Sequence, residues 1–382
     1  MLFFLVFLCS LIYAHKHRSI VYWLIFQVVI MLAIGCYIIA DIDVLYKVDV
    51  GLVSDTRLYY ENYMARWESL KNELFADYPY YLRIFTYPWI NTLYATWGQS
   101  ILSFFLLDVV IRNKRNLLFF IFFHALIYTS TNLFKDNLVL SLGLLGYIVL
   151  KHLNNIWLQC GVIIITFIVI ARIRPFIGYA IPLGLFPFLF RIKSLNVKRI
   201  LFSLSLVIIV GILYSQKDFI LGVMNSLSGD SSVEARSNPV VALVKIFLGP
   251  TPLHYLHSQQ YFEQPFLITQ SYFYSILHYL YYIAFSFFCM YVIDNWKDFI
   301  DMYKMNVAKI FVLFLGLIQL FVYMIIYGSA DIRQRGVIIT FILVYCLADA
   351  ESIFKRKLTY NNMIVFIGVF FFLNLLTFVF NS

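Results

Sequence analysis

A polar block near the C-terminus separates two long apolar runs and contains residues suited to binding an anion. It runs from Ser329 to Gly336 and includes Asp331, Arg333 and Arg335. A charged side chain costs about 2.5–3.5 kcal/mol at the centre of a membrane helix, so one that persists beside apolar runs usually serves a function or a partner. In extended backbone, positions i and i+2 point the same way. Arg333 and Arg335 can therefore present two guanidinium groups, which suit bidentate binding of phosphate oxygens, to one ligand.

Three other polar interruptions have the same character. Arg172 and Arg174 form a second Arg-x-Arg pair, Lys135 and Asp136 stand together between apolar runs, and an acidic, Tyr-rich segment surrounds Asp55. If all these residues lie on one side of a membrane, they can form a single site for an anion. The alternative interpretation is that the cations reach lipid headgroups or pair with neighbouring acids.

The segment around Asp55 combines a carboxylate with aromatic rings. Asp55, Tyr59 or Tyr60, and Tyr63 recur at about one helical turn. Aromatic faces beside carboxylates are good surfaces for sugar rings, and a carboxylate such as Asp55 can act as a general base or orient a sugar hydroxyl. The competing interpretation is an interfacial belt, because Trp and Tyr are enriched where membrane meets water.

A Pro- and Gly-rich segment supplies a further candidate, His254. The segment from Phe247 to His257 is predicted to be a re-entrant or interfacial element. His254 and His257 lie three residues apart but share the segment with no acidic or cysteine partner, so a metal site is not favoured. Proton transfer or hydrogen bonding is the preferred role for His254. Asp55, Asp136 and His254 are thus the candidate proton acceptors.

The elements that must position these residues are membrane helices. The 382 residues are 62% hydrophobic and 13% charged, and the mean hydropathy is +0.82, which lies outside the range of soluble globular proteins. The apolar runs are continuous rather than alternating, which favours a helical bundle over a barrel. We therefore expect an all-α, polytopic helical membrane protein, with residues 1–382 forming one integral membrane domain. The five cysteines have no paired spacing, so they predict neither a disulfide framework nor a metal motif.

Alternation of the apolar runs predicts about twelve transmembrane helices with the N-terminus outside. Basic clusters at 15–18, 112–115, 191–199 and 355–357 then all fall in the cytoplasm, where lysine and arginine concentrate. The expected spans are about 1–14, 20–40, 92–111, 117–129, a fifth ending at Lys151, 156–171, 176–190, 200–214, 267–293, 307–327, 336–348 and 363–380.

This topology creates two long extracytoplasmic loops, 41–91 and 215–264, and places five cations on the side that normally excludes them. The five are Lys135, Arg172, Arg174, Arg333 and Arg335. Their gathering on that side favours an anionic ligand over five separate contacts with lipid.

The same motifs carry a resemblance to a known family. The chain combines Ser54-Asp55 followed by Tyr59-Tyr60, Phe134-Lys135-Asp136, Arg172-x-Arg174-Pro175, Phe247-Leu-Gly-Pro250-x-Pro252 and Asp331-x-Arg333-x-Arg335. In this it resembles the bacterial O-antigen and exopolysaccharide repeat-unit polymerases of the Wzy type. The chain departs from the commoner pattern of that family in having Gln334 between the last two arginines and no proline soon after them.

The resemblance implies a multi-pass glycosyltransferase of the inner membrane with its active site facing the periplasm. Such an enzyme joins oligosaccharide repeats carried on undecaprenyl diphosphate, with no metal, nucleotide sugar or other cofactor. It implies that Arg172, Arg174, Arg333 and Arg335 hold the diphosphates and that Lys135 and Asp136 lie near the reacting centre. A chain-length-determining protein is a possible partner, and no nucleic acid is expected.

Elementary chemistry agrees with that reading, and rival functions share some of its features. Negative charge develops on a diphosphate leaving group as the anomeric bond breaks, and fixed arginines stabilise it. A ligase-like transferase would need the same groups. A transporter or flippase for an anionic lipid-linked saccharide would also gather arginines, but it normally places charges at mid-membrane and contains two internal repeats, which this sequence does not display. The sequence contains no P-loop, dinucleotide or zinc-protease motif.

Overall fold

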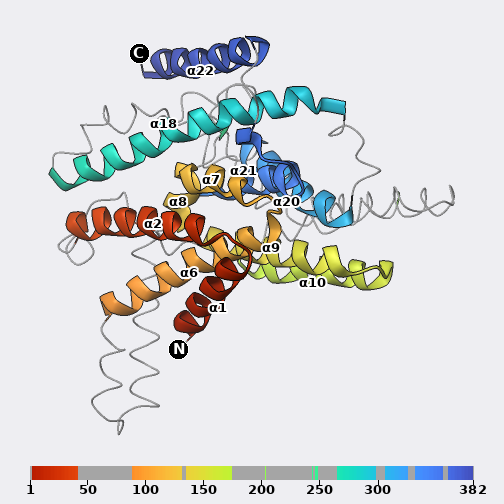
Figure 1. Cartoon of the computed structure of the whole chain (residues 1–382). Helices are drawn as coiled ribbons and strands as arrows, with labels where there is room; N and C mark the ends of the chain where they lie inside the picture. The colour runs from red at the N-terminus through yellow and green to blue at the C-terminus, as the bar shows by residue number, and fades with distance from the viewer. Residues whose placement is uncertain are drawn as a thin grey trace, which may run out of the picture.

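The chain folds into a stack of helices. The computed structural model describes residues 2–41, 88–130, 135–173, 265–297, 306–325, 332–355 and 360–381, together with positions 203, 243, 246 and 247. Within these residues every regular element is a helix and none is a strand, which confirms the all-α class. Figure 1 shows α22 (Tyr360–Asn381) at one margin beside α18 (Pro265–Asp294), and α1 (Leu2–Lys16) at the opposite margin.

The helix bounds follow the predicted apolar runs within a few residues. The prediction of extended backbone at Arg333 and Arg335 is wrong, because α21 (Ile332–Leu347) already includes both residues, and positions i and i+2 of a helix point in different directions. Two predicted spans, 176–190 and 200–214, and nearly all of both long loops lie outside the described residues. The remaining helices are α2 (Ile20–Asp41), α6 (Pro88–Val110), η3 (Lys114–Asn116), α7 (Leu117–Phe122), α8 (His124–Ser130), α9 (Lys135–His152), α10 (Ile156–Ile173), α20 (Val307–Ile325), α21 (Ile332–Leu347) and η6 (Ile353–Lys355).

The predicted span 117–129 is wrong in one respect, because it is not a single helix. It is divided into α7 and α8 at Phe123, whose backbone is extended with φ −72° and ψ 95°. Four of the six residues of α7 and six of the seven residues of α8 are buried. Non-helical backbone inside an apolar medium is tolerated where protein encloses it. The run contains no proline or glycine that would have predicted the break. Because of the break, His124 is the first residue of α8, and its side chain is buried in the protein interior.

Helix α18 contains the segment best suited to crossing a membrane. Phe273–Asp294 is the one stretch in the described part of the chain that is long and apolar enough to do so, and seven shorter apolar helices of 10–17 residues accompany it. The membrane interpretation is thus supported for one helix, and the expected number of spans stays a prediction.

Several turns meet at one end of the stack, which we call the basic end. The Arg112 amide donates to the Ala348 carbonyl at 2.8 Å. The Asn116 side chain donates to the Glu351 carbonyl and accepts from the Ile353 amide, both at 3.0 Å. These contacts join the end of α6 to the end of α21. They also bring the predicted cytoplasmic cluster at 112–115 to the same end of the molecule as Lys355, the described residue of the cluster at 355–357.

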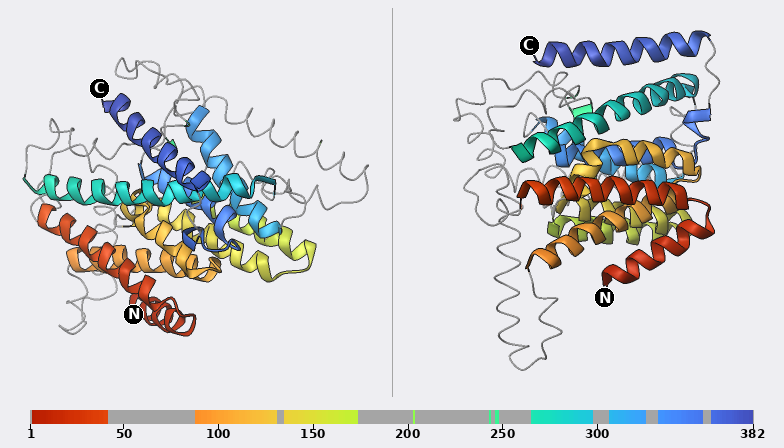
Figure 2. Two further views of the ribbon diagram at one scale, coloured as in Figure 1. Left: turned by 45° about the horizontal axis from the view of Figure 1, so that its top comes forward. Right: turned by 60° about the vertical axis from the view of Figure 1, so that its left-hand side comes forward.

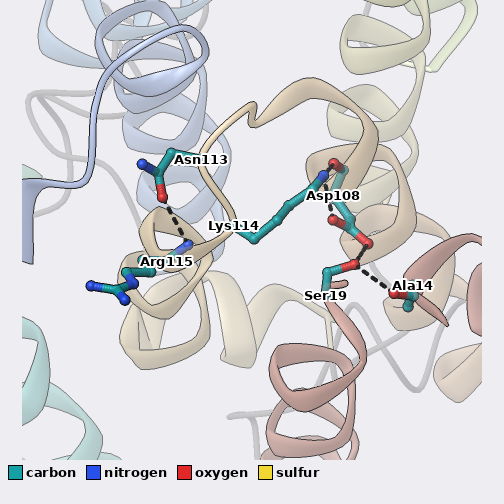
Figure 3. A network of polar contacts seen from close by, with 6 residues as sticks. All are labelled: Ala14, Ser19, Asp108, Asn113, Lys114 and Arg115. Carbon is teal, nitrogen blue, oxygen red and sulfur yellow. Dashed lines mark hydrogen bonds and ion pairs between the residues drawn. The ribbon is translucent and has the colours of Figure 1, made fainter. Parts of the chain in front are cut away.

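The turn between α1 and α2 is fixed to the same end by a buried carboxylate (Figure 3). Asp108, near the end of α6, accepts a hydrogen bond from Ser19 Oγ at 2.6 Å and pairs with Lys114 Nζ at 2.7 Å. Lys114 Nζ also lies 5.5 Å from the centre of the Tyr13 ring. A buried carboxylate persists only when it is paired and hydrogen-bonded. Arg18 in this turn has φ 58°, the left-handed conformation with which many helices end.

Asp349 at the basic end holds two lysines and provides a pH-dependent contribution to stability. Its carboxylate lies 2.9 Å from Lys309 Nζ and 3.2 Å from Lys151 Nζ. Burial raises the pKa of this carboxyl, but the hydrogen bond and charge of Lys309, together with Lys151, outweigh burial and hold the pKa below its ordinary value. Because the folded-state pKa is the lower one, the stabilisation is present above about pH 4 and is lost as the pH falls through the folded-state pKa.

Replacing Asp349 by asparagine is therefore expected to lower the free energy of unfolding by less than about 1 kcal/mol near neutral pH, because solvent screens a partly exposed pair. Thermal unfolding of the purified protein in detergent at several pH values measures the effect. The difference between Asp349→Asn and wild type should shrink on acidification, and a difference independent of pH would contradict the assignment.

Candidate functional site

The described candidate residues lie mostly at the end of the helix stack that is opposite the basic end. The register of α9 against α21 shows how these residues align. A Cβ added at Gly143 of α9 would lie 2.5 Å from the ring of Phe341 of α21. Eight residues further along the chain in each case, Lys151 of α9 and Asp349, two residues past the end of α21, form an ion pair at 3.2 Å. The two helices therefore run in parallel.

The same register brings two candidate segments to one level. Lys135 lies eight residues before Gly143, and Arg333 lies eight residues before Phe341. Because both helices rise by about 1.5 Å per residue, Lys135 and Arg333 lie at the same height along the stack. We call this end, formed by the starts of α9 and α21, the arginine end.

Helix α8 ends at the same height. Gly336 lies so close to α8 that an added Cβ would be 2.6 Å from the Ala125 carbonyl oxygen and 2.5 Å from Thr129 Oγ1. The chain enters α7 at the basic end, so α8 runs toward the arginine end, opposite to α21. Ser130, the last residue of α8, is thus beside the start of α21.

Helix α10 brings Arg172 to the arginine end as well. α9 and α10 form a hairpin in which a Cβ at Gly146 would lie 3.2 Å from Thr166 Oγ1. Arg172 is six residues beyond Thr166, and Asp136 is ten residues before Gly146. The four-residue difference corresponds to about 6 Å along the axis. The last turn of α10 therefore lies near the height at which α9 begins (Figure 2).

Five predicted site residues are thus brought to one end of the stack. They are Lys135, Asp136, Arg172, Arg333 and Arg335, of which Lys135, Arg172 and Arg333 are placed as backbone positions. The other candidates lie outside the described residues, namely Asp55, Tyr59, Tyr60, Tyr63, Arg174 and His254.

Asp136 is buried in the first turn of α9, next to a group of small polar side chains on α6 and α9. A carboxylate is favoured at this position by the helix dipole. Ser103 of α6 donates a hydrogen bond to Asn137 Oδ1, and its oxygen lies 3.3 Å from Ser141 Oγ. Ser100 donates to the Ser130 carbonyl at 2.6 Å. These hydroxyl contacts hold α6 against α8 and α9 directly beneath the cluster of charged residues.

Arg335 is half-buried at the start of α21, and a pair of buried histidines lies on the neighbouring helices α8 and α18. The Arg335 Nη1 atom is buried. His124 stacks on His278 of α18 with ring centres 3.7 Å apart and planes 20° apart. The two histidines are 2% and 0% exposed. The sequence did not identify them as candidates, and the only signal for each is a polar residue within an apolar run.

The arrangement can bind an anion and handle a proton. Arginines and a lysine from three helices converge at one end with the carboxyl group of Asp136, and guanidinium groups suit phosphate oxygens. Among the described residues, no group of three His, Cys, Asp or Glu side chains could hold a metal ion. Comparison of the chain with protein-family models, curated proteins and solved structures finds no match. The resemblance to repeat-unit polymerases therefore stays a prediction.

Proposed function

We propose that this protein is an O-antigen or exopolysaccharide polymerase that joins undecaprenyl-diphosphate-linked oligosaccharide repeats on the periplasmic face of the bacterial inner membrane. The observation that carries the proposal is that Lys135 and Arg333 lie at the same height along the helix stack. Asp136, Arg172 and Arg335 lie near that height at the arginine end. These five residues come from three separate segments of sequence. The basic residues at 15–18 and 112–115 lie at the opposite end of the stack, as they would if that end faced the cytoplasm.

The exposed surface supports a multi-pass arrangement of about twelve spans. Large apolar side chains face outward on the peripheral helices α1, α10 and α22, among them Ile12, Trp157 and Phe371, which are 65%, 78% and 68% exposed. An apolar surface of this extent is unusual on a soluble monomer and suits contact with lipid. The resulting membrane domain would present the arginine end to the periplasm.

In the proposed reaction, a hydroxyl group of one repeat attacks the anomeric carbon of another. The new glycosidic C–O bond forms as the C–O bond to the diphosphate breaks. The hydroxyl proton passes to Asp55, Asp136 or His254, and undecaprenyl diphosphate leaves with the bonding electron pair. Arg172, Arg174, Arg333 and Arg335 stabilise the charge on the departing diphosphate. Tyr59, Tyr60 and Tyr63 provide surfaces for the sugar rings.

The test is to incubate the purified protein in detergent with a synthetic undecaprenyl-diphosphate repeat unit and to separate the products by size. A polymerase should produce a ladder of lengthened lipid-linked chains. A ligase would instead transfer the saccharide to a different acceptor when one is added, without a ladder. A carrier would show turnover only across a sealed bilayer. Either of the last two outcomes would overturn the proposal.

A further inference from the structure

Two serines of α6 form hydrogen bonds to the helices that border the charged residues of the arginine end. Ser100 Oγ donates to the carbonyl of Ser130, the last residue of α8, at 2.6 Å. Ser103 Oγ donates to Asn137 Oδ1 in the first turn of α9 and lies 3.3 Å from Ser141 Oγ, one turn further along. All five residues are at most 5% exposed. Buried hydroxyl groups of α6 thus hold the end of one helix and the start of the next.

The two serines act at different heights along the stack. Both α6 and α9 run toward the basic end, where Arg112 follows α6 and Lys151 lies in the last turn of α9. Three residues of helix correspond to about 4.5 Å, so Ser100 lies closer to the arginine end than Ser103 does. The carbonyl that Ser100 reaches is one that no amide of its own helix can satisfy, because it belongs to the last turn of α8.

The contact made by Ser103 bears on the acidic half of the charged cluster. Asn137 directly follows Asp136, and both residues belong to the turn of α9 that begins with Lys135. The Gln99 carbonyl of α6 lies 3.1 Å from Ser103 Oγ, so this serine would have an acceptor without α9. Asn137 is 0% exposed, and its buried amide oxygen depends on a donor from another helix, which Ser103 supplies. The start of α9 is therefore held by a contact that it cannot lose cheaply.

The contact made by Ser100 bears on the arginine half. Ser130 directly follows Thr129, and a Cβ added at Gly336 of α21 would lie 2.5 Å from Thr129 Oγ1. Gly336 in turn directly follows Arg335. The last turn of α8 is thus fixed by Ser100 on one side and packs against the start of α21 on the other.

We propose that Ser100 and Ser103 are positioning residues that set the separation between the arginines of α21 and the first turn of α9, where Asp136 lies. Helix α6 contributes none of the candidate site residues and serves as the common support for both halves of the cluster. The reaction that this separation serves rests on the proposed function. The separation itself rests on the hydrogen bonds of α6 to α8 and α9.

Ser103→Ala tests the inference by separating ligand binding from reaction. Binding of undecaprenyl diphosphate to the purified protein in detergent, followed by tryptophan fluorescence, should stay within about twofold of wild type, because the arginine half is held by Ser100. The kcat of ladder formation should fall about tenfold, less than the roughly 10²-fold expected for a displacement of about 1 Å. Ser103→Thr retains the hydroxyl group and should recover most of the rate.

Two further variants address the individual hydrogen bonds. Asn137→Ala breaks the Ser103 contact from the side of α9 and replaces Ser103→Ala in the test if that variant does not fold. The Ser103→Ala, Asn137→Ala double variant should be no slower than the slower single variant, because both changes remove the same hydrogen bond. Ser100→Ala releases the arginine half and should weaken binding of undecaprenyl diphosphate about threefold, within the usual range for one lost hydrogen bond.

Ser286→Ala is the matched control. Ser286 of α18 is 0% exposed and donates to the Tyr282 carbonyl of the same helix at 2.9 Å. Its replacement removes a buried hydroxyl group without releasing a neighbouring helix, so kcat and binding should equal those of wild type. Additive losses in the double variant, or a kcat of Ser103→Ala equal to that of Ser286→Ala, would overturn the inference.

Hydrogen exchange distinguishes failure of this inference from failure of the proposed function. The amides of residues 139–145 in α9 should exchange about tenfold faster in Ser103→Ala than in Ser286→Ala, whether or not the protein polymerises anything. If exchange rises but the wild-type protein forms no ladder, the polymerase proposal is wrong and the role of α6 stands. If a ladder forms and either exchange or kcat is unchanged in Ser103→Ala, the positioning role is wrong.

Discussion

Replacing Arg333 by alanine is expected to reduce the rate of repeat-unit joining by about 10²–10³-fold, the usual cost of removing one fixed donor that stabilises a developing negative charge. Arg172→Ala should have an effect of similar size, because α10 brings Arg172 to the same end of the stack. The effect should fall mainly on kcat, since negative charge on the diphosphate grows as the anomeric bond breaks. Ladder formation in detergent with a synthetic lipid-linked repeat measures both rates.

Arg333→Lys separates charge from geometry. Lysine retains the positive charge but cannot bind a phosphate group in a bidentate manner. An intermediate rate is therefore expected. A rate equal to that of wild type would mean that charge alone is required at position 333.

A matched control is available at the opposite end of the molecule. Arg112 and Arg115 are exposed at the basic end, and removing both takes away two positive charges far from the arginine end. The Arg112→Ala, Arg115→Ala double variant should polymerise at the wild-type rate. If it loses as much activity as Arg333→Ala, the loss reflects net charge or membrane orientation, and the site assignment is contradicted.

The apolar runs predicted the positions of the described helices well, because each run is bounded by charged residues or turns. The predicted span 20–40 corresponds to α2 (Ile20–Asp41), and 156–171 corresponds to α10 (Ile156–Ile173). The basic clusters predicted which helix ends lie together at the basic end. These features depend on local sequence, so hydropathy and charge are sufficient to identify them.

Contacts between helices could not be predicted in the same way. The height shared by Lys135 and Arg333 depends on the register of α9 against α21, which Gly143 and Phe341 set through shape complementarity. The stack of His124 on His278 joins two apolar runs that are distant in the sequence. The break at Phe123 has no proline or glycine signal, and the surrounding protein stabilises it. Each of these features results from packing among helices.

Replacing Gly336 by alanine is expected to destabilise the protein by about 2–3 kcal/mol, at the upper end of the usual cost of overpacking a well-packed interior. The added Cβ would lie 2.6 Å from the carbonyl oxygen and 2.9 Å from the carbonyl carbon of Ala125, and 2.5 Å from Thr129 Oγ1. Two of these atoms belong to the backbone of α8, which cannot turn aside as the end of a flexible side chain can. Either α8 or the start of α21 must move.

The movement should reduce activity as well as stability, because Arg333 and Arg335 immediately precede Gly336 on α21. A displacement of about 1 Å at a catalytic group can cost about 10²-fold in rate.

Gly161→Ala is the matched control, since nothing lies within 4 Å of its Cβ position. That change should stabilise α10 by up to about 1 kcal/mol through helix propensity alone. Thermal unfolding in detergent, followed by the ladder assay below the unfolding temperature, measures both effects. If Gly336→Ala is as stable and as active as Gly161→Ala, α8 and α21 do not approach as closely as described, and α8 does not fix the position of Arg333 and Arg335.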